Sequence, residues 1–103
     1  MTANVMMRFE MVMKKDDLAR IDVKDNTITV DLHGLGTCDS NILLNNIINL
    51  NREQHEIRVI HGFNHGIALK DMINRRFNNA RIIGRTINPN NPGMTILACA
   101  AAC

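Results

Sequence analysis

The sequence predicts an α/β domain in which strands and helices alternate along the chain. Three observations predict this fold class. Residues 27–33 alternate apolar and polar side chains, as a half-buried strand does. Residues 41–50 place their apolar side chains three and four positions apart, which is typical of a helix that packs on a sheet. A second strand and a second helix follow, and this alternation favours a right-handed βαβ unit with parallel strands.

The first 26 residues carry a weaker signal. Apolar side chains alternate with mixed neighbours over residues 7–13, which favours a leading strand, with a helix as the alternative. Residues 14–26 are polar and rich in turn formers, so we expect one helical turn and then a connector that closes at Asp25 and Asn26. This part of the chain is an extra element in front of the domain.

The remaining elements follow in the order strand, helix, strand, helix, strand, strand, over residues 27–33, 41–50, 56–60, 67–77, 81–87 and 94–98. The loop after the first strand offers Asp39 or Ser40 as the cap of the first helix. The second helix carries four side chains on one face: Leu69, Met72, Ile73 and Arg76. Turn-forming residues join the last two strands, which we expect to pair as an antiparallel hairpin.

Composition limits the classes of function. The 103 residues, of which 46% are hydrophobic, form one small domain with a modest core. Only 3% are aromatic, which argues against a platform that stacks single-stranded bases. The formal net charge of +2 does not by itself indicate nucleic-acid binding.

Cations gather in one part of the chain. Five of them fall within sixteen residues, with Asp71 as the only acid among them: Lys70, Arg75, Arg76, Arg81 and Arg85. The cluster is consistent with a basic binding surface, and an ordinary solvated helix face is the alternative.

Cysteine usage and hydropathy favour a cytoplasmic protein. Cys38, Cys99 and Cys103 are odd in number and lack the spacing of metal ligands, so we expect neither a disulfide framework nor a zinc site. The sequence shows no secretory signal, and no apolar run approaches the ~18–20 residues that a bilayer span requires. We therefore expect no membrane association, and we expect a monomer.

Two strands of this chain end in the same dipeptide. Residues 27–33 lead into His33-Gly34, and residues 56–60 lead into His61-Gly62. If both strands belong to one βαβ unit, their carboxyl ends lie at the edge where open α/β sheets bind ligands. Asp31, His33 and His61 would then line one site. The structural alternatives are an aspartate that only orients a turn and histidines that bond a strand-end carbonyl.

The loop that begins at His61 suits an anion. Gly62 and Gly66 let backbone N–H groups turn inward, and the first turn of the following helix supplies unpaired donors. A phosphate group fits such a loop, although a tight turn without a ligand is the alternative. A divalent metal on Asp31 and one or two imidazoles is a further option, which nothing in the spacing requires.

These motifs resemble the small MutS-related (Smr) domain family. Residues 30–34 read VDLHG and precede an amphipathic helix, while residues 59–62 read VIHG and precede a glycine-closed loop and a second helix. The similarity covers residues 27–98, and it divides the chain into an N-terminal extension (1–26), an Smr-like domain (27–99) and a short tail (100–103). It implies a two-layer α/β sandwich of order βαβαββ with a mixed four-stranded sheet, similar to the C-terminal domain of a bacterial translation initiation factor.

The resemblance also implies nucleic-acid binding, often with endonuclease activity on DNA or RNA. The family ties its Asp-x-His pair to cleavage, and here that pair is Asp31 and His33. Its second motif, His-Gly-x-Gly, corresponds in its first two positions to His61 and Gly62. The implied nucleic-acid contacts come from the two glycine turns and the second helix: Gly34, Gly62, Asn64, His65, Gly66, Lys70, Arg75 and Arg76.

This chain departs from the second motif at one point. Phe63 and Asn64 stand where the common pattern has Lys and Gly. Loss of that lysine removes a phosphate-binding cation, for which Lys70 or Arg75 would have to compensate.

The mechanism implied for this site is acid–base cleavage of a phosphodiester. His33 takes a proton from a ribose 2′-hydroxyl or from water, and Asp31 fixes the tautomer of its ring. His61 or His65 protonates the leaving oxygen, while loop amides and Lys70 stabilise the added negative charge. Attack by a 2′-hydroxyl requires RNA and no metal, whereas a Mg²⁺ requirement favours attack by water, which can also occur on DNA.

Two other functions stay open. The domain could bind RNA or structured DNA through phosphate contacts without cleaving it, in which case binding is strongly salt-dependent and no product forms. It could instead dock on a protein or on the ribosome. An exposed Met-rich N-terminus would favour docking, because flexible Met surfaces suit partner contact.

Overall fold

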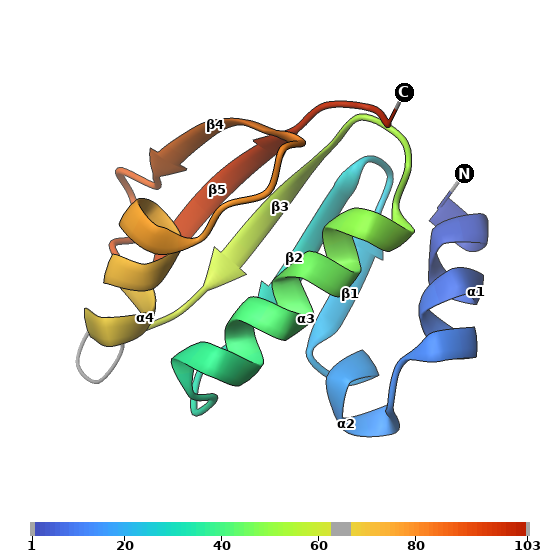
Figure 1. Ribbon diagram of the computed structural model, residues 1–103, viewed down its shortest axis with the longest axis horizontal. Coiled ribbons are helices and arrows are strands. Elements are labelled where there is room, and N and C mark those ends of the chain that lie inside the picture. Colours follow the sequence, from blue (N-terminus) through green and yellow to red (C-terminus); the bar gives the residue numbers. More distant parts are fainter. Residues whose placement is uncertain (1, 63–66, 103) are drawn as a thin grey trace.

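The computed structural model describes residues 2–62 and 67–102, with side chains from Val5 onward, and these residues form a five-stranded sheet with helices on one face (Figure 1). The elements are α1 (Thr2–Val12), α2 (Lys15–Leu18), β1 (Ile21–Lys24), β2 (Thr27–Asp31), α3 (Thr37–Leu50), β3 (His55–Ile60), α4 (Ile67–Asp71), η1 (Met72–Arg76), β4 (Ile82–Ile87) and β5 (Met94–Cys99). The strand order is β1-β2-β3-β5-β4. β2 and β3 run parallel, as the βαβ pattern predicts, and the other neighbours are antiparallel.

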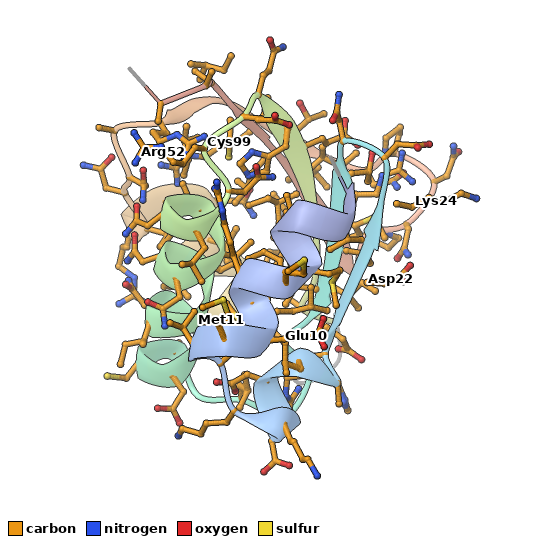
Figure 2. The ribbon with its side chains drawn as sticks, turned by 90° about the vertical axis from the view of Figure 1, so that its right-hand side faces the viewer. Glu10, Met11, Asp22, Lys24, Arg52 and Cys99 are labelled. Atoms are coloured by element: carbon orange, nitrogen blue, oxygen red, sulfur yellow. The ribbon has the colours of Figure 1, made fainter. Side chains whose placement is uncertain are left out.

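The N-terminal segment is a helix, so the leading strand predicted over residues 7–13 is wrong. Val5 and Phe9 lie four positions apart and are both buried, whereas Met7 and Met11 are 59% and 82% exposed. The buried pair therefore follows the period of a helix and not that of a strand. α1 packs beside α3 and β1, which Figure 2 shows from the side of the molecule.

The polar stretch after α1 contains the predicted helical turn, α2, and then a strand where we expected a connector. β1 pairs antiparallel with β2, from Ile21 opposite Val30 to Lys24 opposite Thr27. The predicted turn at Asp25 and Asn26 joins them, with Asp25 at a φ of 55° that aspartate tolerates. The sheet consequently has five strands and not the predicted four, and the N-terminal extension supplies one of them.

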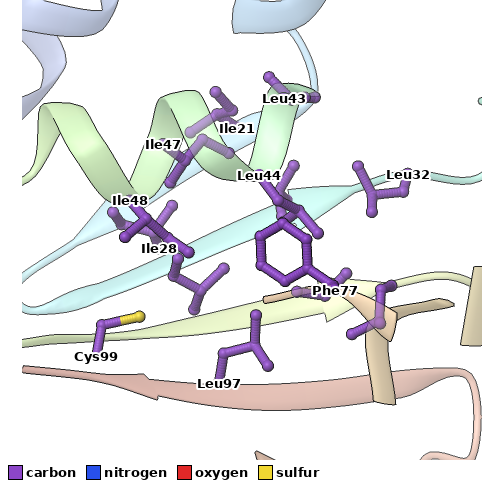
Figure 3. Close-up of a cluster of buried hydrophobic side chains, with 14 of the residues drawn as sticks. Ile21, Ile28, Leu32, Leu43, Leu44, Ile47, Ile48, Phe77, Leu97 and Cys99 are labelled. Carbon is purple, nitrogen blue, oxygen red and sulfur yellow. The ribbon is translucent and has the colours of Figure 1, made fainter. Parts of the chain in front are cut away.

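α3 covers the sheet with the face that its periodicity predicts. Leu43, Leu44, Ile47 and Ile48 are buried against inward-facing side chains of β2, β3 and β5 (Figure 3). The helix begins at Thr37, with Gly36 as its first flanking residue and no side-chain cap. The expected cap at Asp39 or Ser40 is therefore wrong. Ser40 instead lies buried inside the first turn.

The second predicted helix is present over residues 67–76, but its last turn is a π-helix. Leu69, Met72 and Ile73 are buried as expected, whereas Arg76 is exposed. The Phe77 N–H donates to the carbonyl of Met72, five residues earlier, at 2.6 Å. This wider turn brings Phe77 onto the buried face in place of Arg76.

The last two strands form the predicted antiparallel hairpin. β5 lies between β3 and β4, and the pairing of β4 is irregular between Ile82 and Gly84. The hairpin loop returns toward the end of β3, where the Gly93 carbonyl accepts hydrogen bonds from His61 N (2.9 Å) and Gly62 N (3.1 Å). This loop therefore supports the second His-Gly turn.

Candidate functional site

The carboxyl ends of β2 and β3 lie side by side, as the βαβ pattern predicts. Asp31 is opposite Ile60 in the parallel register, and the Leu32 N–H donates to the Ile60 carbonyl at 2.8 Å. The segments 31–34 and 61–62 consequently leave the sheet at the same edge. The two motifs on which the Smr resemblance rests, at residues 30–34 and 59–62, therefore lie next to each other in the structure.

Both His-Gly turns need glycine for their backbone conformation. Gly34 has a φ of +87° and Gly62 a φ of +75°, values in the left-handed region that other residues rarely adopt. A Cβ atom on Gly62 would lie 3.5 Å from Cδ2 of His33. The ring of His33 therefore lies against the backbone of Gly62, and this contact joins the two turns.

The Asp31 carboxylate holds the backbone of the first turn. Its Oδ1 atom accepts a hydrogen bond of 2.9 Å from the backbone N–H of His33. Both side chains are exposed, and the ring nitrogens of His33 make no hydrogen bond to any described residue. Asp31 thus positions His33 through the backbone, as expected for an aspartate that orients a turn. The expected hydrogen bond between the Asp31 carboxylate and the His33 imidazole is absent from the described contacts.

Arg20 also contacts this turn, and sequence reasoning missed it. Its Nη1 atom donates to the carbonyls of Asp31 and His33, both at 3.0 Å. The backbone reinforces the contact, because the Asp31 N–H donates to the Arg20 carbonyl at 2.9 Å. Arg20 lies outside the region that resembles the Smr family, and a single arginine before a short strand carries no motif that could have identified it.

His61 is fully buried and bonded inside the domain. The Gly62 carbonyl lies 2.6 Å from Nδ1 and can only accept, so Nδ1 carries the proton and Nε2 accepts from the Thr95 hydroxyl at 3.0 Å. The amide of Asn74 donates to the same hydroxyl at 3.2 Å. Both ring nitrogens are therefore engaged, which favours a positioning role over the proton-donating role expected for His61.

Burial lowers the pKa of His61 below its ordinary value of 6.5. The hydrogen bond to the Gly62 carbonyl opposes this shift, and the charge of Lys70 adds to it. The ring is consequently neutral near pH 7. It anchors the Gly62 peptide against which the His33 ring lies.

A cavity of about 260 Å³ opens between the two turns and the starts of α3 and α4. Its lining comes from the ends of β2 and β3 and from the two helices: His33, Gly34, Leu35, Gly36, Thr37, His61, Ala68 and Leu69. Of these, His33 presents an exposed imidazole. Among the described lining residues, His33 is therefore the histidine that can exchange a proton with a bound molecule.

The five predicted cations do not form one surface. Arg81 donates to the carbonyls of Ile48, Asn51, Glu53 and Ala100, and Arg85 donates to that of Ile73. These two guanidinium groups hold the domain together, so neither the basic-surface nor the solvated-face interpretation applies to them.

The other three cations lie on α4 and η1. Arg75 and Arg76 lie 3.4 and 3.8 Å from the Asp71 carboxylate. Lys70 and Arg75 line a separate cavity of about 220 Å³ beside Ile87, and Arg76 lines another with Thr37. Of these cavities, only the one with Arg76 shares a lining residue, Thr37, with the cavity at His33.

The predicted contacts at Asn64, His65 and Gly66 lie outside the described residues. Elsewhere in the chain, over residues 2–62 and 67–102, no three His, Cys, Asp or Glu side chains lie together in a way that could hold a metal ion. In the same ranges, no helix has the length and apolar character of a membrane span.

Comparisons with protein-family models, with curated proteins and with solved structures found no match to this chain. The structure itself defines a compact α/β protein with a five-stranded mixed sheet. Its candidate site is the edge at which Asp31, His33 and Gly62 meet.

Proposed function

We propose that this domain binds nucleic acid and cleaves a phosphodiester bond at the edge where β2 and β3 end. One observation supports this most: the exposed His33 ring, with no hydrogen bond to a described residue, lies against Gly62 at the mouth of a cavity. The turn that carries it is bonded by Asp31 and Arg20. A histidine that is fixed in place but open to a ligand suits proton transfer. The resemblance to Smr domains adds the substrate class and an initiation-factor-like fold.

The proposed reaction is cleavage of RNA by its own 2′-hydroxyl. His33 takes the proton of that hydroxyl, the 2′-oxygen forms a bond to phosphorus, and the bond from phosphorus to the 5′-oxygen breaks. The products are a 2′,3′-cyclic phosphate and a 5′-hydroxyl, whose proton comes from water or from His65. Backbone amides and a nearby cation stabilise the charge that builds on the phosphate.

Asp31 has a positioning role in this proposal. The hydrogen bond to the backbone N–H of His33 holds the turn that carries the ring.

The test compares the protein with its His33→Ala variant on end-labelled single-stranded RNA and on supercoiled DNA, each with EDTA or with Mg²⁺. Gln54→Ala is the matched control, because Gln54 is exposed at the opposite end of β3. We expect cleavage of RNA in EDTA that depends on His33 and not on Gln54. Nicking of DNA only with Mg²⁺ would move the mechanism to attack by water. Undiminished cleavage by His33→Ala would contradict the assignment of the base.

A non-catalytic binding module is the second candidate, favoured by the internal bonding of His61. The described residues offer His33 as an acid–base group in the cavity, without a second histidine free to act as the acid. Salt-sensitive binding without product would support this candidate. The exposed Met7 and Met11 favour docking on a protein or on the ribosome instead. Binding to such a partner with an affinity that does not depend on salt concentration, and that is lost when these side chains are removed, would support that function.

A further inference from the structure

The N-terminal extension brings a cation to the candidate site. Arg20 follows α2, where its N–H donates to the Asp17 carbonyl at 3.1 Å, and it immediately precedes β1. Its side chain reaches across the end of β2 and bonds the carbonyls of Asp31 and His33. The residue therefore joins the extension to the turn that carries the exposed imidazole.

Only part of the Arg20 guanidinium is used in these bonds. Both carbonyls are bonded by Nη1, while the described contacts include none from Nε or Nη2. The N–H groups of Nε and Nη2 lie on the same side of the planar group and form a fork that matches two oxygens of a phosphate. Arg20 is half-buried, so the residue keeps part of its surface in solvent while the Nη1 bonds hold its guanidinium group.

Arg20 lies between the cavity at His33 and a groove of mixed charge, whose lining also carries Lys14, Asp16, Asp17 and Asp39. Arg20 lines a groove of about 430 Å³ between the N-terminal helices and α3, and Leu35 lines both this groove and the cavity at His33. The described contacts of the cations on α4 and η1 include no hydrogen bond to the turn that carries His33, whereas Arg20 makes two. Arg75 and Arg76 face Asp71, and Lys70 lines a cavity that does not include His33.

We propose that Arg20 is a phosphate-binding residue of this site. It binds a phosphodiester through Nε and Nη2, while Nη1 holds the turn that carries His33. This inference rests on the proposed function, since it names the cation that holds the same substrate. It also makes the N-terminal extension part of the site. Arg20 acts on the proton transfer through His33, so it is a positioning residue for that step.

The test measures binding of a fluorescein-labelled single-stranded RNA whose riboses are 2′-O-methylated, so that it cannot attack its own phosphates. Fluorescence anisotropy over a range of NaCl concentrations gives the dissociation constant and its salt dependence. We expect Arg20→Gln to weaken binding roughly 10-fold, as the loss of a charge-assisted hydrogen bond does. The slope of log affinity against log salt should fall by about 0.7, the value for one phosphate contact on a single strand.

Two further variants separate charge from geometry. Arg20→Lys keeps the charge but loses the fork, so we expect the salt slope of the wild type and slower cleavage of unmodified RNA. Arg52→Gln removes the same charge from an exposed residue before β3, and we expect its affinity and slope to match the wild type. An Arg20→Gln variant that is folded by circular dichroism and binds like the wild type would overturn the inference.

A measurement on the unaltered protein covers the case in which Arg20→Gln does not fold. The ¹⁵N–¹H NMR signal of the Arg20 Nε–H should shift when the methylated RNA is added. An unchanged Nε signal alongside shifted backbone signals of Gly34 and Gly36 would overturn the inference while leaving the proposed function intact. Absence of any binding by the wild type to this RNA or to DNA would instead contradict the proposed function itself.

Discussion

The backbone N–H of His33 donates a hydrogen bond of 2.9 Å to the carboxylate of Asp31, two residues earlier. The Asp-x-His motif is therefore joined through the main chain, and the imidazole stays open to solvent. Together with the Nη1 bonds of Arg20, this contact sets the position of the ring above Gly62.

Substitutions of Asp31 separate its hydrogen bond from its charge. Asp31→Asn keeps an oxygen acceptor for the His33 N–H, so we expect unchanged stability but loss of cleavage, because an amide replaces the carboxylate of the Asp-x-His pair that the Smr resemblance ties to cleavage. Asp31→Ala removes the acceptor as well and should cost about 1 kcal/mol of unfolding free energy. Urea unfolding and RNA cleavage measure the two effects. Full activity of Asp31→Asn would leave Asp31 with the turn-holding role alone.

The left-handed conformation of Gly62 makes it sensitive to any side chain. Gly62→Ser should lose about 1–2 kcal/mol, because an L residue is strained at a φ of +75°. The new Cβ would lie 3.5 Å from Cδ2 of His33, an ordinary van der Waals contact, so the loss comes from the strained backbone. Relief of that strain would move the turn against which the His33 ring lies, so cleavage should fall with stability. Gly36→Ser is the matched control, since Gly36 has a φ of −72° with open space around it and serine is favoured at that helix start. Equal stability of the two variants would contradict this account.

The hydroxyl of Thr95 supports the second His-Gly turn through its hydrogen bond to the His61 ring. Thr95→Val removes the donor to Nε2 of His61 and the acceptor of the Asn74 amide, both in buried or half-buried surroundings. We expect a loss of about 1–3 kcal/mol, the cost of leaving buried polar groups unpaired. Thr86→Val on β4 makes the same change at an exposed strand position and should stay within about 0.5 kcal/mol of the wild type. Thermal unfolding of both variants measures this difference.

Stability should fall as the pH drops below about 6.5, because two buried histidines resist protonation. Burial lowers the pKa of both His55 and His61 in the folded protein, while the unfolded chain titrates near 6.5. The unfolded state therefore binds more protons below that pH, and the stabilisation present above it is lost as the pH falls toward the folded pKa values. Urea unfolding from pH 7.5 to 5 measures the slope. His55→Gln removes one of the two groups and should flatten it, so an unchanged slope would contradict this assignment.

Local periodicity predicted most of the framework correctly. The alternation over residues 27–33 and the helical spacing of Leu43, Leu44, Ile47 and Ile48 identified β2 and α3, since each element buries one face of its own. The same pattern predicted the parallel pairing that brings His33 and His61 to one edge. It failed for α1 and β1. In α1, the alternation puts Met7 and Met11 on the same face as Phe9, yet both methionines are exposed while Phe9 is buried. In β1, Ile21 and Val23 form too short a pattern to predict a strand alone.

The sequence by itself determined the order of the later elements and the edge at which Asp31 and His33 lie, because strand and helix periods are local properties. Only the tertiary structure decided what each polar side chain does. The His61 ring bonds Thr95, 34 positions away, and Arg81 bonds the Ile48 carbonyl, 33 positions away. Arg20 bonds the His33 carbonyl from the turn before β1. A buried polar group takes whichever partner the folded chain brings to it, so such roles depend on contacts that no local pattern contains.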